Sequence, residues 1–289
     1  MRIIGAMDVH RGQITFKFQD RDRGVRRGRT PCDRESVRKW LEDLGGGDGG
    51  HIALEATTGW RFVAEEIQGV GYTAHLAEPA EAGARGWPKG RAKPDKTDCD
   101  NMVELLTIGR LPESWIPPDH LLEVRTLVRL RKDLVDERRK WRQRIQAQLF
   151  DQGLPGGIRL TTDKGRARLA AAELSPAGRQ VVATGLRVID PLDQQLEPID
   201  RQLIGLAKRQ PGCQGLTRLY GVGHLTAVAI WAELGDRRRF PNSDDYDAPI
   251  TFSRNRGTPP LSPLPPTSCP NAAEAVGLLR EPATGRGYG

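Results

Sequence analysis

Apolar runs alternate with polar turns along the amino-terminal part of the chain and predict a layered domain. A nearly all-apolar run at the start indicates a buried strand, and the polar–apolar alternation after Gly12 is typical of a half-buried hairpin partner. The pattern predicts strands at 2–8, 13–18, 51–55 and 72–76, and helices at 36–44, 60–68 and from 96 onward. This order is typical of a mixed α/β fold, in which the charged residues 20–29 form a solvated turn or a strand edge.

Two long amphipathic helices are predicted farther along the chain. The first runs from His120 to Phe150, and its apolar side chains recur mainly at intervals of seven; in the second they step by three and four. The apolar seam comprises Leu127, Leu130, Leu134, Trp141, Ile145 and Leu149 in the first helix and Ile189, Leu192, Leu196, Ile199, Leu203 and Leu206 in the second. With the polar stretch 153–185 between them, these helices predict a coiled-coil hairpin or a dimerisation arm.

Composition narrows the class of protein. The 289 residues carry a formal net charge of +7, which fits a polyanionic partner. The cysteines lie far apart without paired spacing, so a zinc module or a disulfide framework is not expected, and a reducing cytoplasm is. No apolar run approaches the roughly 18 residues of a membrane span, and no signal peptide precedes the first strand. We therefore expect a cytoplasmic protein without membrane contact.

Acidic residues stand where a metal site could form. Asp8 ends the first strand, Glu55 ends the strand at 51–55, and Asp98 lies in the first turn of the helix that Asp95 or Thr97 caps. Two divalent cations about 4 Å apart need carboxylates that converge from separate elements. The alternatives are a turn-capping role for Asp8 and an ordinary first-turn acid at Asp98.

The joint spacing of several motifs resembles one family. The motifs are Gly5-Ala-Met-Asp8-Val-His, Leu54-Glu55-Ala-Thr, Asp95-Lys96-Thr97-Asp98, the segment 221–236 and Arg239-Phe-Pro. They resemble the DEDD-type insertion-sequence transposases, relatives of the Piv- and MooV-like DNA invertases, over residues 1–245. The resemblance implies a RuvC-like amino-terminal domain of the ribonuclease-H-like class. It also implies Mg²⁺-dependent DNA cleavage and rejoining at sites that a guide RNA specifies.

The same resemblance assigns roles to the acids. It makes Asp8, Glu55 and Asp98 the first three members of a catalytic tetrad and the Mg²⁺ ligands. Asn101 occupies the place of the fourth acid and offers a neutral oxygen but no charge, so Mg²⁺ affinity should fall. Asp100 is one position away, turned by about 100° on a helix. Both residues are candidates for the fourth place.

Basic and glycine-rich segments suggest contacts with nucleic acid. The loop 85–96 and the outward face of the first long helix are basic, and 219–227 resembles a helix-hairpin-helix turn whose glycines let backbone N–H groups approach a phosphate. The candidate contacts are Lys89, Arg91, Lys93, Arg131, Lys132, Arg138, Arg139, Gly221, Gly223, Arg237 and Arg238. A solvated charge run and a plain tight turn are the alternatives. The expected partners are DNA (element ends and target), a guide RNA and further copies of this chain through the coiled coil.

The chain changes character after Asp245. Prolines are dense between Pro249 and Pro270 and no apolar periodicity remains, so 246–289 is predicted to be a disordered tail. The resemblance implies a nucleophilic serine where this chain has Pro259; the nearest serines are Ser253 and Ser262. A frameshift is the simplest explanation, and complete recombination is expected to be impaired.

These inferences predict four regions and three possible activities. The regions are a RuvC-like domain at 1–118, a coiled-coil helical region at 119–210, a truncated carboxy-terminal transposase domain at 211–245 and the tail at 246–289. The favoured activity is DNA transposition or site-specific recombination. The alternatives are a resolvase-like, structure-selective nuclease that uses Asp8, Glu55 and Asp98 without a serine, and a non-catalytic nucleic-acid-binding remnant.

Overall fold

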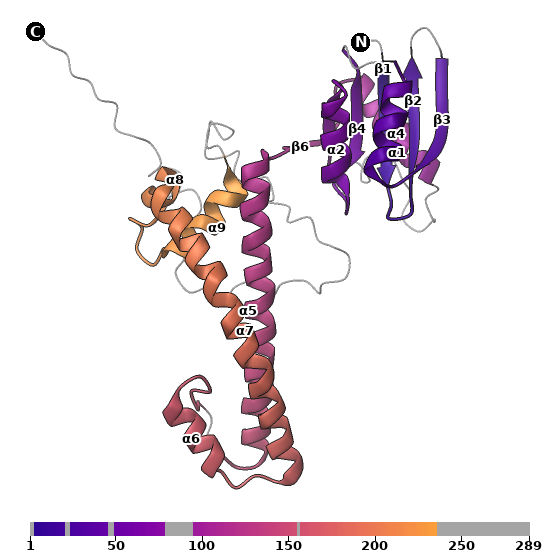
Figure 1. Ribbon diagram of the computed structural model, residues 1–289. Helices are drawn as coiled ribbons and strands as arrows, with labels where there is room; N and C mark the ends of the chain where they lie inside the picture. The colour runs from indigo at the N-terminus through magenta and orange to yellow at the C-terminus, as the bar shows by residue number, and fades with distance from the viewer. Residues whose placement is uncertain (1–2, 21–23, 46–48, 79–94, 155–156, 236–289) are drawn as a thin grey trace, which may run out of the picture. The chain divides into compact units, whose positions relative to one another are not determined.

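A computed structural model shows the helices and strands of the chain (Figure 1). It describes residues 3–20, 24–45, 49–78, 95–154 and 157–235, with side chains in the helix at 95–107 described from Asp98 onward. The described residues fall into two compact units, one ending at Ile116 and the other beginning at Pro117. The predicted tail lies outside the described residues.

The first unit is built on a mixed sheet. Its described strands are β1 (Ile3–Val9), β2 (Gln13–Asp20), β3 (Gly24–Pro31), β4 (His51–Glu55), β5 (Thr73–Ala77) and β6 (Glu113–Ser114). They lie in the order β3-β2-β1-β4-β5-β6, in which β1, β4 and β5 are parallel to one another and β2, β3 and β6 pair antiparallel to their neighbours. This order is ribonuclease-H-like and confirms the predicted mixed α/β class.

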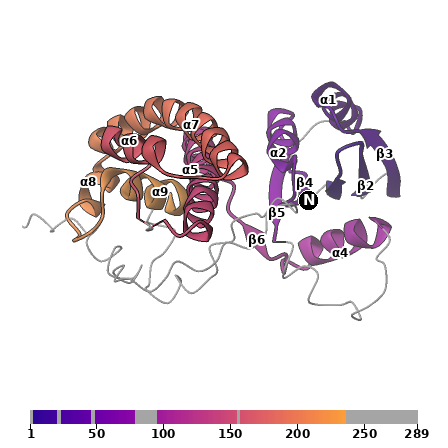
Figure 2. The same ribbon diagram turned by 90° about the horizontal axis from the view of Figure 1, so that it is seen from below.

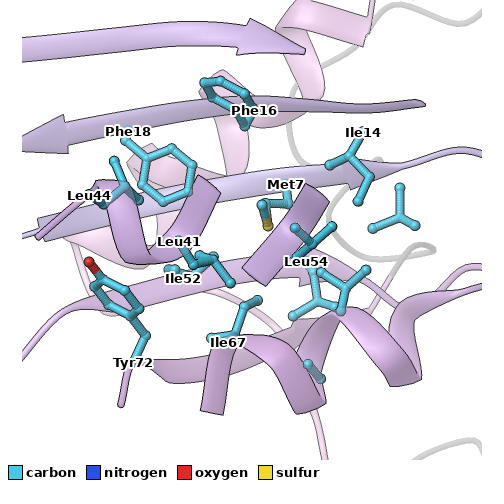
Figure 3. Close-up of a cluster of buried hydrophobic side chains, with 14 of the residues drawn as sticks. Met7, Ile14, Phe16, Phe18, Leu41, Leu44, Ile52, Leu54, Ile67 and Tyr72 are labelled. Carbon is cyan, nitrogen blue, oxygen red and sulfur yellow. The ribbon is translucent and has the colours of Figure 1, made fainter. Parts of the chain in front are cut away.

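Helices cover both faces of this sheet (Figure 2). The helices of this unit are α1 (Arg34–Asp43), α2 (Trp60–Gly69) and α4 (Asp95–Thr107). On the face of α1 and α2, the apolar side chains that alternate along the strands form the larger core, which includes Met7, Phe18, Leu41 and Ile52 (Figure 3). On the opposite face, α4 packs Cys99, Met102, Val103 and Leu106 against small strand residues.

Small side chains let α4 approach the sheet. Ala6, Ala53 and Ala77 occupy one position on each of the three parallel strands, and all three are fully buried under α4. Strand residues alternate between faces, so the residues two positions farther along β1 and β4 also face α4. Those residues are Asp8 and Glu55.

The second unit is helical. Its helices are α5 (Asp119–Asp151), α6 (Asp163–Ala171), α7 (Pro176–Arg209), α8 (Pro211–Leu216) and α9 (His224–Leu234). α5 and α7 lie side by side and antiparallel (Figure 1), because Val124 clusters with Leu203 at one end and Ile145 with Ile189 at the other. α6 joins the cluster around Ile145, and α8 and α9 complete the cluster around Val124. None of the described helices combines the length and apolar character needed to cross a membrane.

Close approach and charge pairing hold α5 against α7. A Cβ placed on Gly185 would lie 2.7 Å from Cδ1 of Ile145, so only glycine fits there without a shift of the Ile145 side chain. Arg138 on α5 donates to Asp193 on α7 at 2.5 Å. Arg125 donates to the carbonyl oxygens of Ala232 and Glu233, in the last turn of α9, at 2.7 and 2.8 Å. The arginine thus caps the last turn of α9.

Several sequence-based boundaries were wrong. Residues 24–31 form the edge strand β3, which settles the choice for the charged stretch in favour of a strand edge. Part of the stretch at 153–185 is helical, because α6 lies within it and α7 already begins at Pro176. Neither Asp95 nor Thr97 is the N-cap residue of α4, because the helix already begins at Asp95. Leu130 does not belong to the apolar seam, since 45% of its surface is exposed.

A histidine pair on the sheet predicts a pH dependence of stability. Nδ1 of His51 lies 2.8 Å from Nε2 of His75, whose Nδ1 lies 2.9 Å from Glu113 Oε1. Burial, and then the charge of His75, lower the pKa of His51 below its ordinary value of about 6.5. The unfolded chain therefore binds a proton at this position before the folded chain does, so stability falls as the pH drops below about 6.5.

We expect the urea midpoint of the full chain to decrease from pH 7 to pH 5, and His51→Gln to flatten that decrease. His224→Gln alters an exposed histidine on α9 and should leave the pH profile as it is in the wild type. A profile that keeps its wild-type slope in His51→Gln would exclude this source of the pH dependence.

Candidate active site

Asp8 and Glu55 lie side by side at the carboxyl ends of two parallel strands. Met7 pairs with Leu54, and the next position in the same register brings Asp8 beside Glu55. Adjacent strands are about 4.8 Å apart, and both residues face α4. Asp8 is buried, with 3% of its surface exposed, whereas Glu55 is partly exposed. The sheet therefore aligns two carboxylates at one edge.

Asp98 lies in the first turn of α4, above the same face. Cys99, the next residue, packs under the helix: its thiol donates to the backbone oxygen of Thr15, the residue that pairs with Asp8 across β1 and β2. Each residue of a helix is turned by about 100° from the last, so Asp98 and Asp100 flank Cys99 on opposite sides. Asp100 reaches toward β2 and β3, which leaves Asp98 on the side of β1 and β4. The structure thus places three predicted acids on one face of the sheet.

The two candidates for the fourth acid differ in their surroundings. Asp100 bonds Lys17 Nζ at 2.7 Å and two Nη atoms of Arg27 at 2.8 and 2.9 Å, so both of its oxygens meet cations. The hydrogen bond from Arg27 is the main cause that lowers the pKa of Asp100. Asn101 follows Asp98 by three positions, on a neighbouring part of the helix surface. Asp100 therefore ties α4 to β2 and β3, and Asn101 shares the side of Asp98.

Two residues at this edge were not predicted as parts of the site. His10 Nε2 lies 3.0 Å from Asp8 Oδ2, and Cys99 is buried close enough to Asp8 to respond to its charge. Burial, together with the negative charge of Asp8, raises the pKa of Cys99 to about 12, so the thiol stays protonated at neutral pH. The Asp8-Val-His spacing was visible in the sequence, but it was interpreted as a turn. Nothing in the sequence pointed to Cys99.

The donor chemistry of this edge fits a hard divalent cation. Asp8, Glu55 and Asp98 offer carboxylate oxygens, which Mg²⁺ prefers, and β1 and β4 hold two of them in register. Among the described residues, no three side chains of the histidine, cysteine, aspartate and glutamate types are yet close enough together to surround a metal ion. The described part of this edge therefore supplies suitable oxygens on two adjacent strands but contains no preformed ligand cluster.

The predicted nucleic-acid contacts on α5 are largely paired with acids. Arg131 donates to Asp200 at 2.5 Å, Arg138 bonds Asp193, and Lys132 bonds Asp136 within α5. Arg131 and Arg138 thus face α7, although an outward face was predicted for them. Arg139 is exposed.

The glycine-containing turn connects α8 and α9. Gly221 has a φ of +81°, which favours glycine, and Gly223 is the N-cap of α9. The turn thus joins two packed helices, while its role in phosphate binding stays a prediction. Other candidates lie outside the described residues, and they are Lys89, Arg91, Lys93, Arg237, Arg238, Ser253 and Ser262.

Known proteins share this sequence pattern. A family model of the DEDD IS110 type, described as a transposase, matches residues 6–152. The chain is 27% identical over 205 residues to the transposase for insertion sequence element IS1328 of Yersinia enterocolitica, which covers 68% of this chain and 58% of that protein. It is 23% identical over 209 residues to the transposase for insertion sequence element IS1111A of Coxiella burnetii (strain RSA 493 / Nine Mile phase I), which covers 69% of this chain and 55% of that protein. The matches thus span more than half, but less than two thirds, of these relatives.

Proposed function

Because the chain belongs to the IS110 family of DEDD transposases, we propose that its acidic edge cleaves DNA strands with the help of bound Mg²⁺. The register of Asp8 with Glu55 under α4 carries this proposal, because it aligns two charged oxygen donors at one point. Family membership implies the use of a divalent metal and the binding of DNA. Mg²⁺ as the metal, and this edge as the site of cleavage, are our assignment.

Each acid has a proposed task. Asp8, Glu55 and Asp98 would hold Mg²⁺, which polarises a phosphoryl oxygen and stabilises the charge that develops during strand cleavage. Burial of Asp8 fixes its position, since the carboxylate has little room to move. His10 orients Asp8 through its Nε2 contact. Asn101 would complete the set with a neutral oxygen, at a cost in affinity.

We infer that recombination needs parts beyond this edge. We propose that a guide RNA specifies the DNA sites, as the family resemblance implies. We also propose that several copies of the chain assemble through the α5–α7 region. The place implied for the nucleophilic serine holds Pro259, so we propose that complete recombination is impaired while metal and DNA still bind.

A cleavage and joining assay tests the proposed function. The full chain is incubated with matched element ends, guide RNA and Mg²⁺, and cut strands are counted separately from joined products. We expect Mg²⁺-dependent cuts with few joined products. Efficient joining would refute the impairment, and branched-DNA cuts that persist without a guide would favour the resolvase-like nuclease. Salt-dependent binding without any cleavage would favour the non-catalytic remnant.

A further inference from the structure

Arg29 lies on the edge strand β3 in the same cross-strand row as Asp8. Thr15 pairs with Asp8 on one side and with Arg29 on the other. Residues that pair directly across antiparallel strands point to the same face of a sheet. Because Lys17 and Arg27, which pair in the next row, both reach Asp100 on α4, this face is the one that α4 covers. Arg29 therefore stands on the face of the acids, beyond Thr15.

Arg29 differs from its basic neighbours in this region. Lys17 and Arg27 both form ion pairs with Asp100, whereas Arg29 is exposed and forms no ion pair with any residue that the structure describes. A guanidinium binds phosphate oxygens in a bidentate manner and keeps its charge at any physiological pH. Across the sheet, this row therefore contains Arg29, then Thr15, and then the two acids Asp8 and Glu55.

We propose that Arg29 binds a phosphate of the DNA strand that Asp8 and Glu55 act on. This inference rests on the proposed function. Neighbouring carboxylates repel a polyanion, so a cation in the same row lowers the cost of bringing the strand to the acids. The contact positions the strand and carries no base specificity.

The spacing of the row sets where the contact falls. Two strand intervals of about 4.8 Å separate Arg29 from Asp8, or about 10 Å in total. The axial rise of one DNA strand is about 3.4 Å per nucleotide. Arg29 would therefore hold a phosphate a few nucleotides from the one at the acids.

Arg26 provides a matched control on the same strand. It pairs with Phe18, whose side chain lies in the core under α1 and α2, so Arg26 stands on the opposite face. Like Arg29, it is exposed. Arg29→Gln and Arg26→Gln thus remove the same charge from the two faces of one strand.

The test measures binding of the full chain to a fluorescently labelled DNA duplex of random sequence, over a range of salt concentrations. Ca²⁺, another cation with oxygen ligands, replaces Mg²⁺ during binding. We expect Arg29→Gln to raise the Kd several-fold and to reduce the slope of log K against log salt by about one, as for one lost phosphate contact. Arg29→Lys should keep the slope, and Arg26→Gln should match the wild type.

Equal effects of Arg29→Gln and Arg26→Gln, or no effect of either, would overturn the proposal. If the wild type cleaves DNA but Arg29→Gln and Arg26→Gln have equal salt slopes, the role of Arg29 is refuted and the proposed function is kept. If only Arg29→Gln reduces the salt slope but the wild type does not cleave DNA, the proposed function is refuted and the phosphate contact is kept.

Discussion

Asp8→Asn is expected to lower the rate of Mg²⁺-dependent strand cleavage at least about a hundredfold. Asparagine has nearly the shape of aspartate, so the strand and the buried position are kept while the charge that holds the cation is lost. The rate is measured with the full chain and a labelled DNA substrate under single-turnover conditions. DNA binding should remain, because the substitution removes a negative charge from the site.

Asp98 and Asp100 give the matched comparison within one helix. Asp98→Asn should behave like Asp8→Asn, whereas Asp100→Asn should keep the rate within about threefold of the wild type, because Asp100 bonds Lys17 and Arg27. If Asp98→Asn and Asp100→Asn lower the cleavage rate equally, the two acids act by holding α4 in place and not by binding metal.

Arg125→Met is expected to destabilise the helical unit by about 2–4 kcal/mol. The Arg125 side chain is only 14% exposed and donates to two carbonyl oxygens in the last turn of α9, those of Ala232 and Glu233. Methionine keeps most of the packing volume but donates no hydrogen bond, so these carbonyl groups lose their partner. Urea unfolding of the full chain, followed by far-UV circular dichroism, gives the change.

Arg129→Met is the control for this prediction. Arg129 reaches Glu233 at 3.5 Å, and its side chain is 46% exposed. Pairs of this kind contribute about 0–1 kcal/mol. A loss in Arg129→Met as large as that in Arg125→Met would show that the charge near Glu233 matters more than the cap on α9.

The sequence predicted those elements whose apolar pattern is strong. β1, β2, β4 and α5 lie close to their predicted bounds, because each buries a regular apolar face. β3 was harder to identify, because it is an edge strand whose side chains are mostly exposed and often charged, so it shows no apolar pattern. The start of α7 was missed because its first turns pack through glycine at Gly185, which gives no apolar signal.

The site was predicted only in part, because contacts between distant residues do not show in the sequence pattern. The resemblance singled out Asp8, Glu55 and Asp98, and strand register shows why the first two can act together. The spacing along the helix indicated that Asp100 turns away from Asp98, but only the positions of Lys17 and Arg27 explain what Asp100 bonds. Arg29 could not be predicted, because its place beside Asp8 depends on the register of three strands.

The most direct measurement is the binding of Mn²⁺ to the full chain, followed by the electron paramagnetic resonance signal of the free ion. Mn²⁺ accepts the same oxygen ligands as Mg²⁺. We predict that the wild type and Asp100→Asn deplete free Mn²⁺ alike, whereas Asp8→Asn and Glu55→Gln bind it at least about tenfold more weakly. Binding of equal strength in the wild type and Asp8→Asn would contradict a shared metal site at the ends of β1 and β4.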